Sequence, residues 1–433
     1  MKFNKNLLIT LSLFSCSLTF GQSWSAVGNG ANGEVDALDS TNGNLYMGGL
    51  FSTAGSASVS NVAQWNGVTW SAVGGGTDGE VYALAGSGAD LYAGGIFANA
   101  DGNPASNIAM WNGTAWSAMG NGMNNSVYAL CIMGGNLYAA GEFTIAGTST
   151  ALHVAMWNGS TWSAVGSGFN GDVVALGIYN GNLYAGGTFD SSGTTAVDHI
   201  AMWNGSAWVS IGGVTKSVRS LVAYQGNLYI GGSVTGTGYA TNAVASWNGT
   251  TWSTPMKMNG YVPSLDVYNG NLYCGGGFDS VNASPAINYI LSWNGTAFSS
   301  VGSGMNSFGY VLCMANYNGF MYAGGLFTSA GGKPANYVAQ WNGVAGINEL
   351  YNAEDIKVYP NPSNGKFAIE SLVVSGQSSV EVYNMMGEKV YSGFLNEQES
   401  EIDLSGQASG IYMYRILSAT GQPEATGKLV IQQ

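Results

Sequence analysis

One stretch decides the fold of this chain: residues 81–119, which read VYALAGSGADLYAGGIFANADGNPASNIAMWNGTAWSAM. Four short apolar or alternating runs lie within it, at residues 81–84, 90–97, 107–111 and 115–119. Runs of this length, bounded by glycine and asparagine, are typical of β-strands joined by tight turns. An Asn-Gly pair between two runs tolerates the positive φ angles that a two-residue hairpin turn requires. The stretch therefore predicts a unit of four short strands.

The same unit recurs along the chain and is marked by Trp-Asn-Gly. The marker begins at seven tryptophans, spaced 44 to 48 residues apart: Trp65, Trp111, Trp157, Trp203, Trp247, Trp293 and Trp341. A fixed period in the forties is typical of β-propellers, in which one repeat is one blade that cannot bury its faces alone. We therefore predict an all-β fold whose main part, residues 22–345, is a seven-bladed β-propeller.

The two ends of the repeat array predict how the ring closes. The fourth strand of the unit carries an aromatic residue at Trp24, Trp70, Trp116, Trp162, Trp208, Trp252 and Phe298. The first of these precedes every other strand, and no such strand follows Trp341. We expect residues 23–27 to pair with the strand around Trp341, because closure removes the free sheet edge of an open array.

The second strand of the unit carries a further motif, for example Asn182-Leu-Tyr-Ala-Gly-Gly-Thr-Phe189. This motif, followed by a loop, an apolar strand and a tryptophan, resembles the kelch repeat and the repeats of fungal cortical-marker proteins. The resemblance covers about residues 22–345. It implies a propeller and leaves the activity open, since kelch-like propellers include both enzymes and binding modules.

Residues 1–21 have the pattern of a secretory signal peptide. Lys2 and Lys5 precede an apolar run at residues 7–14, and small or polar residues follow. A loose match to a lipoprotein box at Cys16 is the alternative. No later segment reaches the ~18 apolar residues of a membrane-spanning helix, so we expect no transmembrane segment. The formal net charge of −13 argues against nucleic acid as a partner.

The chain changes character after Gly343, where the repeat stops and charged residues become more frequent. We predict a linker at residues 346–355 and a separate domain at 356–433. Short alternating runs separated by Pro-Asn-Pro, Met-Gly-Glu and Ala-Ser-Gly predict that this domain is a small Ig-like β-sandwich. An accessory binding domain is one interpretation of such a tail.

The same tail resembles the C-terminal type A sorting domain of the type IX secretion system of Bacteroidetes-like bacteria. The matching residues are Tyr359, Pro360, Asn361, Pro362, Gly365, Gly387, Gly410, Tyr412 and Lys428. The resemblance implies that the tail engages the type IX machinery and that the protein is secreted or attached to the outer cell surface. It also implies that the tail is cut off in the exposed linker.

No catalytic set is evident in the sequence. The two histidines, His153 and His199, take the place of Asn61 and Asn107 in the repeat, which indicates a hydrogen-bonding position at a strand edge. Three cysteines of the mature chain lie in apolar strand patterns, which indicates buried free thiols at Cys131, Cys274 and Cys313. We therefore predict no catalytic residue and no cofactor, and we leave metal binding open.

Acidic residues indicate a candidate binding face. In a four-stranded antiparallel blade, the loops from strand two to three and from strand four to the next strand one share one face. Most charged residues of the repeats lie in these loops, and the candidates are Glu34, Asp78, Glu80, Asp101, Asp172, Asp190, Asp198 and Asp279. The functional interpretation is a face that binds a cation, a cationic partner or sugars through calcium. The alternative is simple solvation of long loops.

The sequence thus predicts a secreted or cell-surface binding or adhesion propeller for a glycan or protein ligand, and not an enzyme. The alternative is a carboxylate-based polysaccharide hydrolase or lyase, which two acids converging in one pocket would favour. Under the first prediction, neutralising Asp101, Asp190 and Asp198 together abolishes ligand binding.

Overall fold

The structure is a computed structural model, and the chain divides into two compact units, Met1–Val344 and Ala345–Gln433. The predicted signal peptide, the predicted linker and Gly387 lie outside the described residues. Those described are 23–214, 216–233, 243–282, 284–285, 287–306, 309–343, 356–371, 378–384, 389–395, 399–417 and 423–432.

Each repeat of the first unit forms one four-stranded antiparallel sheet. In the first sheet the order is β2 (Val35–Thr41), β3 (Asn44–Gly49), β6 (Val62–Trp65) and β7 (Trp70–Ala72). The turn between β2 and β3 is Asn42-Gly43, with φ angles of 49° and 74°. Both angles are positive, as a two-residue hairpin turn requires, which explains why Asn-Gly stands there.

The same order recurs in six further sheets among the described residues of this unit. The second sheet consists of β8 (Glu80–Ser87), β9 (Asp90–Ile96), β12 (Ile108–Trp111) and β13 (Trp116–Ala118). The third consists of β14 (Val127–Met133), β15 (Asn136–Gly141), β18 (Val154–Trp157) and β19 (Trp162–Ala164). The fourth consists of β20 (Val173–Tyr179), β21 (Asn182–Gly187), β24 (Ile200–Trp203) and β25 (Trp208–Ser210). The fifth sheet consists of β26 (Val218–Tyr224), β27 (Asn227–Gly232), β28 (Ala243–Trp247) and β29 (Trp252–Lys257). The sixth consists of β30 (Ser264–Tyr268), β31 (Asn271–Gly275), β34 (Ile290–Trp293) and β35 (Phe298–Ser300). The seventh consists of β36 (Tyr310–Tyr317), β37 (Phe320–Leu326), β40 (Val338–Asn342) and β1 (Ser23–Ala26).

Among the described residues, a short two-stranded ribbon lies in the loop between the second and third strands of six of these sheets; most of that loop in the fifth sheet falls outside them. The ribbons are β4 (Thr53–Ala54) with β5 (Ala57–Ser58), β10 (Asn99–Ala100) with β11 (Asn103–Pro104), β16 (Ile145–Ala146) with β17 (Ser149–Thr150), β22 (Ser191–Ser192) with β23 (Thr195–Ala196), β32 (Ser280–Val281) with β33 (Ser284–Pro285), and β38 (Ser329–Ala330) with β39 (Lys333–Pro334).

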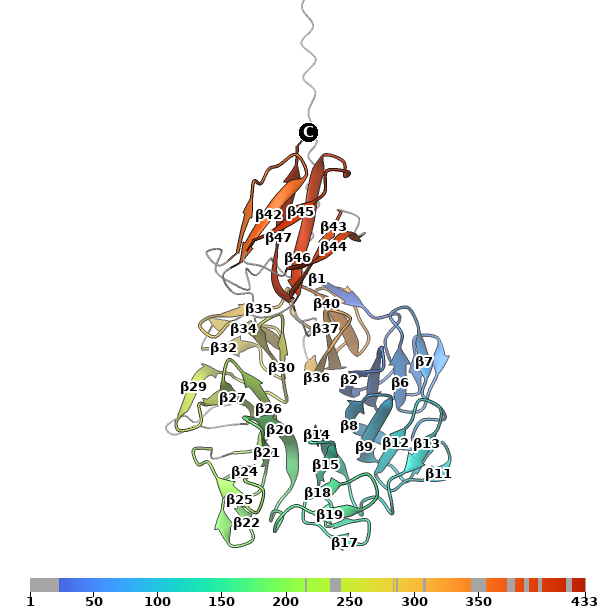
Figure 1. Cartoon of the computed structure of the whole chain (residues 1–433). Coiled ribbons are helices and arrows are strands. Elements are labelled where there is room, and N and C mark those ends of the chain that lie inside the picture. Colours follow the sequence, from blue (N-terminus) through green and yellow to red (C-terminus); the bar gives the residue numbers. More distant parts are fainter. Residues whose placement is uncertain are drawn as a thin grey trace, which may run out of the picture. The chain divides into compact units, whose positions relative to one another are not determined.

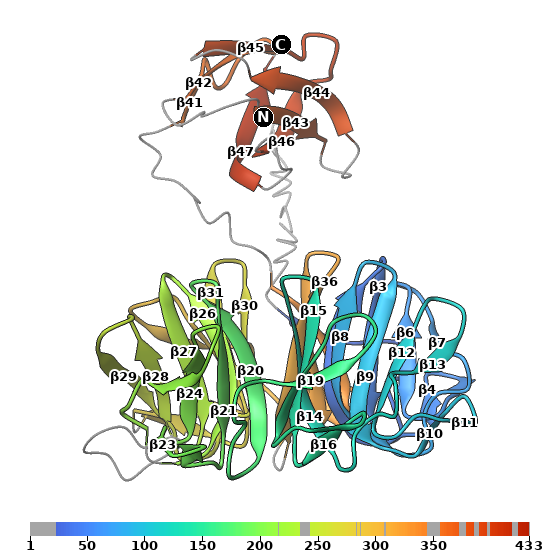
Figure 2. The same cartoon turned by 60° about the horizontal axis from the view of Figure 1, so that its bottom comes forward.

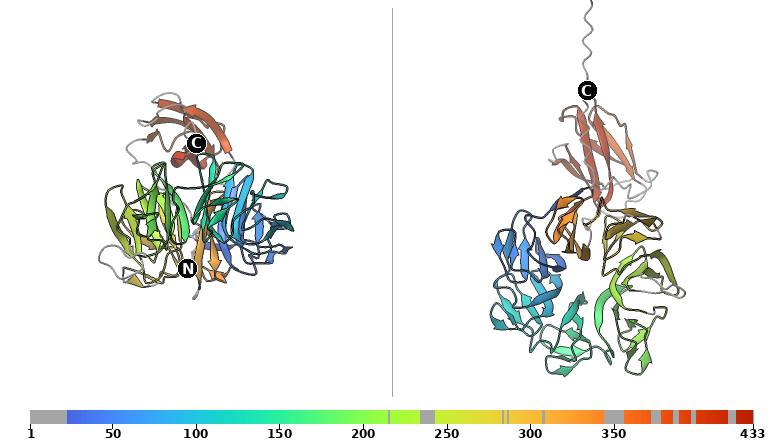
Figure 3. Two further views of the ribbon diagram at one scale, coloured as in Figure 1. Left: turned by 90° about the horizontal axis from the view of Figure 1, so that it is seen from below. Right: turned by 180° about the vertical axis from the view of Figure 1, so that it is seen from behind.

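The first strand of each repeat lies nearest the axis around which the sheets are arranged (Figures 1 and 2). These innermost strands contact one another in sequence order: β2, β8, β14, β20, β26, β30 and β36. The last of them, β36, contacts β2 again. The arrangement is propeller-like, and the view from behind shows the same ring (Figure 3, right).

The N-terminal strand β1 pairs with β40, with Trp24 opposite Trp341. The Trp24 indole nitrogen donates a hydrogen bond to the carbonyl oxygen of Val301 over 2.9 Å, and the Trp24 and Trp341 rings are 5.1 Å apart. The neighbouring sheet is tied to the same segment, because Trp70 donates to the carbonyl of Val27 over 2.9 Å. Segment 23–27 therefore contacts the sheets on both sides of it.

The second unit has two sheets that enclose one core. One consists of β41 (Ile356–Tyr359), β42 (Lys366–Ser371) and β45 (Glu399–Asp403), and the other of β44 (Lys389–Leu395), β43 (Ser378–Tyr383), β46 (Gly410–Leu417) and β47 (Pro423–Ile431). Its largest buried side chains include Phe367, Ile402, Tyr412 and Ile416. The all-β prediction is confirmed for the described residues, in which no helix is long and apolar enough to cross a membrane.

Two predictions about single residues need correction. Nδ1 of His153 donates a hydrogen bond to the Gly141 carbonyl oxygen over 3.0 Å, as the strand-edge interpretation expects. Nδ1 of His199, in contrast, is buried without a hydrogen-bond partner. The shared property of Asn61, Asn107 and both histidines is a positive φ of 63° to 67°. All three cysteines are free thiols, as predicted, and Cys274 and Cys313 are buried. The prediction of burial is wrong for Cys131, which lies partly exposed on the innermost strand β14.

Candidate functional site

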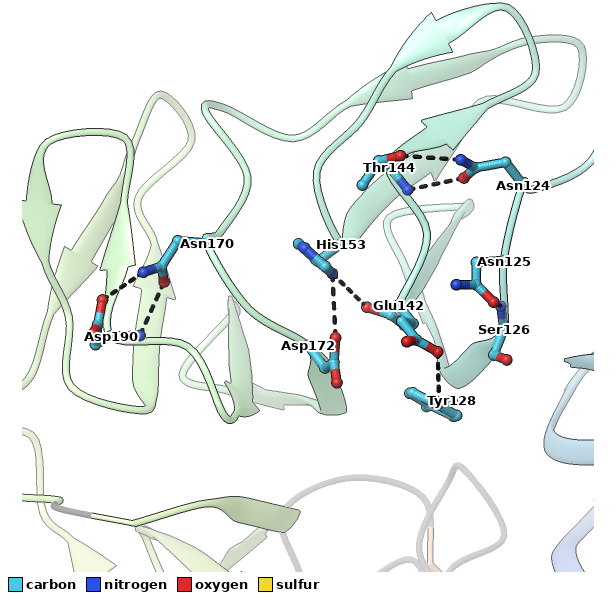
Figure 4. Close-up of polar contacts among 11 residues, drawn as sticks. Asn124, Asn125, Ser126, Tyr128, Glu142, Thr144, His153, Asn170, Asp172 and Asp190 are labelled. Carbon is cyan, nitrogen blue, oxygen red and sulfur yellow. Dashed lines mark hydrogen bonds and ion pairs between the residues drawn. The ribbon is translucent and has the colours of Figure 1, made fainter.

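Three of the predicted acidic residues serve to hold neighbouring loops together. Asp78 Oδ1 accepts hydrogen bonds from the backbone amides of Ala98 and Asn99 over 2.9 and 2.8 Å. Burial would raise the pKa of Asp78, but these bonds outweigh it and the pKa is lowered. In equivalent loops, Oδ1 of Asp190 and of Asp279 accepts a hydrogen bond from the side-chain amide of Asn170 and of Asn259, each over 2.6 Å. Figure 4 shows the Asn170–Asp190 contact.

Two further candidates lie at turns of the same loops. Asp101 and Asp198 have φ angles of 52° and 48°, and Asp101 Oδ1 accepts a bond from the Gly75 amide over 3.0 Å. Aspartate tolerates this left-handed conformation better than most residues. The five loop acids thus belong to the loops of three different sheets, and the structure does not bring them together as one group.

Glu34 and Glu80 do converge, together with an aspartate that sequence reasoning missed. Glu34 directly precedes β2 and Glu80 begins β8, while Asp36 is the second residue of β2. One carboxylate oxygen from each of the three lies within 4.8 Å of the others. Carboxylate oxygens at this spacing are ligands that a divalent cation such as Ca²⁺ prefers. Within the part of the chain that the structure describes, these three residues could together hold a metal ion.

A β-bulge explains how Asp36 reaches this place. The pairing of β2 with β3 shifts register between Val35 and Ala37, so Asp36 is the extra residue of a bulge. The same shift recurs in five other innermost strands, where the extra residues are Tyr82, Tyr128, Val174, Arg219 and Leu312. Bulges often redirect a side chain next to a functional site. The flanking positions keep small or apolar residues, whereas the bulged position differs between most of the repeats.

The bulged tyrosines extend the acidic group along the ring. The Tyr82 hydroxyl donates to Glu80 over 2.8 Å, and the Tyr128 hydroxyl donates to Glu142 over 3.2 Å. The two rings lie 5.5 Å apart at 55°. We call Glu34, Asp36, Glu80, Tyr82, Tyr128 and Glu142 the axial cluster. Oδ1 of Asp172, which directly precedes β20 of the next sheet, lies 3.7 Å from Nδ1 of His153 (Figure 4).

The fifth to seventh sheets carry other residue types at or near the starts of their innermost strands. The Arg219 guanidinium lies 6.0 Å from the centre of the Tyr261 ring, and the Tyr261 and Tyr310 rings are 5.6 Å apart. Arg219 is a bulged residue, Tyr310 begins β36 and Tyr261 precedes β30. The acids are therefore gathered on one part of the ring and further aromatic rings lie on the other.

Crowding of the acids changes their ionisation. Burial, together with the charges of Glu34 and Glu80, raises the pKa of Asp36 to about 8. Its Oδ2 atom is buried without a hydrogen-bond partner. Burial and the charge of Glu80 also raise the pKa of Glu34. Burial and the two neighbouring glutamates thus favour the protonated form of Asp36.

This ionisation predicts a pH-dependent stability. The folded-state pKa of Asp36 exceeds the unfolded value of about 3.9, so its contribution is complete below pH ~4 and is lost as the pH rises through about 8. The substitution Asp36→Asn removes the ionisable group and with it this loss of stability at high pH. We therefore expect the free energy of unfolding of the variant at pH 9 to exceed that of the wild type by about 2 kcal/mol, allowing for partial exposure to solvent. Urea unfolding of the full chain at pH 5, 7 and 9 measures this. Asp198→Asn, at an exposed turn, is the control, and equal pH profiles for Asp36→Asn and wild type would contradict the assignment.

Two other acids of the innermost strands are satisfied internally. Asp39 accepts the Gly86 amide over 2.5 Å, and Asp266 accepts from the Asn316 side chain over 3.2 Å. Burial raises the pKa of Asp266 to about 6, although a bond from the Val267 amide lowers it. These contacts link neighbouring innermost strands, which is a structural role.

A cavity of about 450 Å³ lies elsewhere, between loops of the first and second sheets. Asn32, Phe51, Asn61 and Asp78 are among its lining residues. Asn32, Asn61 and Asp78 already make hydrogen bonds to backbone groups of the loops, which is a structural role.

Comparison with known proteins identifies the tail. Residues 357–432 match the family model described as a secretion system C-terminal sorting domain. The protein is therefore exported through the type IX secretion system, to the cell surface or the medium. A comparison with curated proteins found no match.

Some solved structures match the chain at low sequence identity. The extracellular domain of a protein described as a hybrid two-component system of B. thetaiotaomicron is 11% identical, with a TM-score of 0.47 over 95% of this chain. The chain spans 59% of that structure. PorZ, a surface component of the type IX system of Porphyromonas gingivalis, is 14% identical (92% and 70% of the two chains, TM-score 0.32). A copper-bound fungal alcohol oxidase is 12% identical (95% and 100%, TM-score 0.46).

Proposed function

We propose that this exported protein is a binding module that recognises a glycan at the axial cluster. The predicted signal peptide at residues 1–21 would begin export, and the tail would complete it by engaging the type IX machinery. The observation that carries the proposal is the convergence of three carboxylates and two tyrosine rings at bulged ends of the innermost strands.

The scaffold in this proposal is a kelch-like seven-bladed propeller that its N-terminal strand closes. Seven four-stranded sheets whose innermost strands contact one another in a cycle support this interpretation. The pairing of β1 with β40 supports the closing role of the N-terminal strand. A closed ring has no free sheet edge and holds side chains from separate repeats at fixed distances.

The chemistry of the axial cluster suits a sugar. Tyrosine rings offer apolar faces against which a sugar ring can pack, with hydroxyls that are held by Glu80 and Glu142. Ionised carboxylates are strong acceptors for sugar hydroxyls. A calcium ion held by Glu34, Asp36 and Glu80 would add a further ligand for hydroxyl oxygens. Negatively charged polysaccharides are disfavoured unless such an ion is present.

A glycan array probed with the full exported chain tests this function. We expect binding to a family of hydroxyl-rich glycans, and we expect calcium to strengthen it. A chelator then weakens the signal and addition of calcium restores it. Absence of binding to any arrayed glycan, with and without calcium, would contradict the proposal.

A second function is favoured by one observation, the raised pKa of Asp36 between two glutamates. Two carboxyl groups with different ionisation can act as acid and base in cleaving a polysaccharide. Release of reducing ends from a polysaccharide, lost in the variants Asp36→Asn and Glu80→Gln, would replace the binding proposal with a hydrolase. Release of unsaturated ends would indicate a lyase.

A further inference from the structure

The four-stranded sheet of the tail, β44-β43-β46-β47, has one covered and one open face. Side chains alternate between the faces of a strand. Val380, Val382, Tyr412 and Tyr414 point into the core between the two sheets of this unit. The residues between them in the sequence, together with their neighbours in β44 and β47, therefore form the opposite face.

This outer face is both cationic and apolar. We define it by Glu381, Tyr383, Lys389, Phe394, Ile411, Met413, Arg415 and Lys428. Phe394 is 67% exposed and Ile411 is 44% exposed. Large apolar side chains exposed next to charges are typical of surfaces that bind another protein.

A hydrogen-bonded network fixes the charges of the outer face. Glu381 binds Lys389 Nζ over 2.8 Å and Arg415 Nε over 2.7 Å, and it accepts the Tyr383 hydroxyl over 2.6 Å. The Arg415 guanidinium lies 5.1 Å from the centre of the Tyr383 ring. The bond from Lys389, followed by those from Tyr383 and Arg415, lowers the pKa of Glu381 to about 2. The two cations thus keep defined positions, which suits recognition of a partner with a fixed shape.

The charge of the outer face contrasts with the rest of the tail. Residues 345–433 contain five basic and eleven acidic residues, a net charge of −6. The outer face contributes three basic residues and one acidic residue, +2, which leaves −8 for the remainder. Of the other two lysines, Lys366 lies near Glu401 and Asp403 of the opposite sheet, at 3.3 and 3.4 Å.

We propose that the outer face is the surface by which the tail docks on an acidic protein surface of the export machinery. Opposite charge would orient the encounter, and Phe394 and Ile411 would supply the apolar contact. An anionic lipid surface fits less well, because the strongly acidic remainder of the tail would be repelled. The proposal rests on export through the tail and is independent of the ligand of the axial cluster.

Export of the full chain from a type IX-competent host tests the proposal. The variant Phe394→Ser with Lys428→Glu alters the outer face without touching the Glu381 network. We expect its amount in the medium and on the cell surface to fall at least roughly tenfold, with folded protein retained in the periplasm. Lys366→Gln on the opposite sheet is the matched control and should be exported as the wild type is.

The outcomes separate the alternatives. Export of the double variant at the wild-type level overturns the proposal. If the double variant unfolds at a lower temperature than the wild type, Lys428→Glu alone decides, because its exposed side chain lies at the sheet surface. Co-sedimentation of the wild-type chain with phosphatidylglycerol vesicles, lost in Lys428→Glu, would overturn it in favour of a lipid surface. Unchanged export after removal of residues 345–433 would instead overturn the role of the tail itself.

Discussion

Replacement of Trp24 by alanine is expected to lower the free energy of unfolding of the chain by about 3–5 kcal/mol. Trp24 is 1% exposed, packs on Trp341, and donates its indole hydrogen to the Val301 carbonyl. Alanine would leave a cavity, an unpaired carbonyl oxygen and a weakened contact between the first and last repeats. Thermal and urea unfolding of the purified chain measure the loss.

Trp116→Ala provides a matched control within a single repeat. Trp116 occupies the same strand position, is 6% exposed and donates to the Val73 carbonyl over 2.7 Å. If segment 23–27 completes the last sheet, the two substitutions destabilise the protein to a similar extent. A loss for Trp24→Ala far below that for Trp116→Ala would show that the N-terminal strand does not close the ring.

Removal of the tail should abolish export while leaving the repeat unit folded. A chain that ends near Gly346 keeps every described strand from β1 to β40 and the cores of that unit. It lacks the sorting domain at residues 357–432. In a type IX-competent host we expect this chain in the periplasm and only background amounts in the medium, measured by fractionation and immunoblotting.

Two checks make the export result specific. The retained chain should show the same strand-rich circular dichroism and cooperative unfolding as the repeat unit of the full protein. Normal amounts of truncated chain in the medium would contradict the sorting role of the tail.

The repeat sequence predicted most strand positions because turn residues mark them. The runs at 90–97 and 107–111 became β9 at Asp90–Ile96 and β12 at Ile108–Trp111. The run at 81–84 became the longer strand β8, Glu80–Ser87, because Ala85, Gly86 and Ser87 pair in the hairpin with β9. The pattern of apolar residues does not indicate that these residues belong to the strand, because their pairing is made by backbone hydrogen bonds.

The candidate site could be predicted only in part. Sequence reasoning placed Glu34 and Glu80 on one face, but it gave equal weight to Asp78, Asp190 and Asp279, whose contacts lie within the loops. The sequence does contain a signal for that role. The repeat position of Asp78 is asparagine in other repeats, at Asn32, Asn124 and Asn170, and the side-chain oxygen of asparagine can accept the same hydrogen bonds from a loop backbone.

Asp36 was missed because simple strand alternation does not include a bulge. The signal was present in the repeat itself. The second position of Val35-Asp-Ala-Leu38 is tyrosine in the next two repeats, whereas the valine before it and the Ala-Leu after it recur there. A single changing position within a recurring apolar motif indicates a side chain that is free to serve binding.

The most direct test of the proposed binding site compares two multiple variants on the same glycan array. One, the tyrosine variant, carries Tyr82→Ala with Tyr128→Ala in the axial cluster. The other, the outer-loop variant, carries Asp101→Asn, Asp190→Asn and Asp198→Asn in the loops between the second and third strands of the second and fourth sheets. We predict that the binding signal of the tyrosine variant is at least about tenfold lower than that of the wild type and that the outer-loop variant retains the wild-type signal. Loss of binding in the outer-loop variant, with full binding in the tyrosine variant, would contradict recognition at the axial cluster.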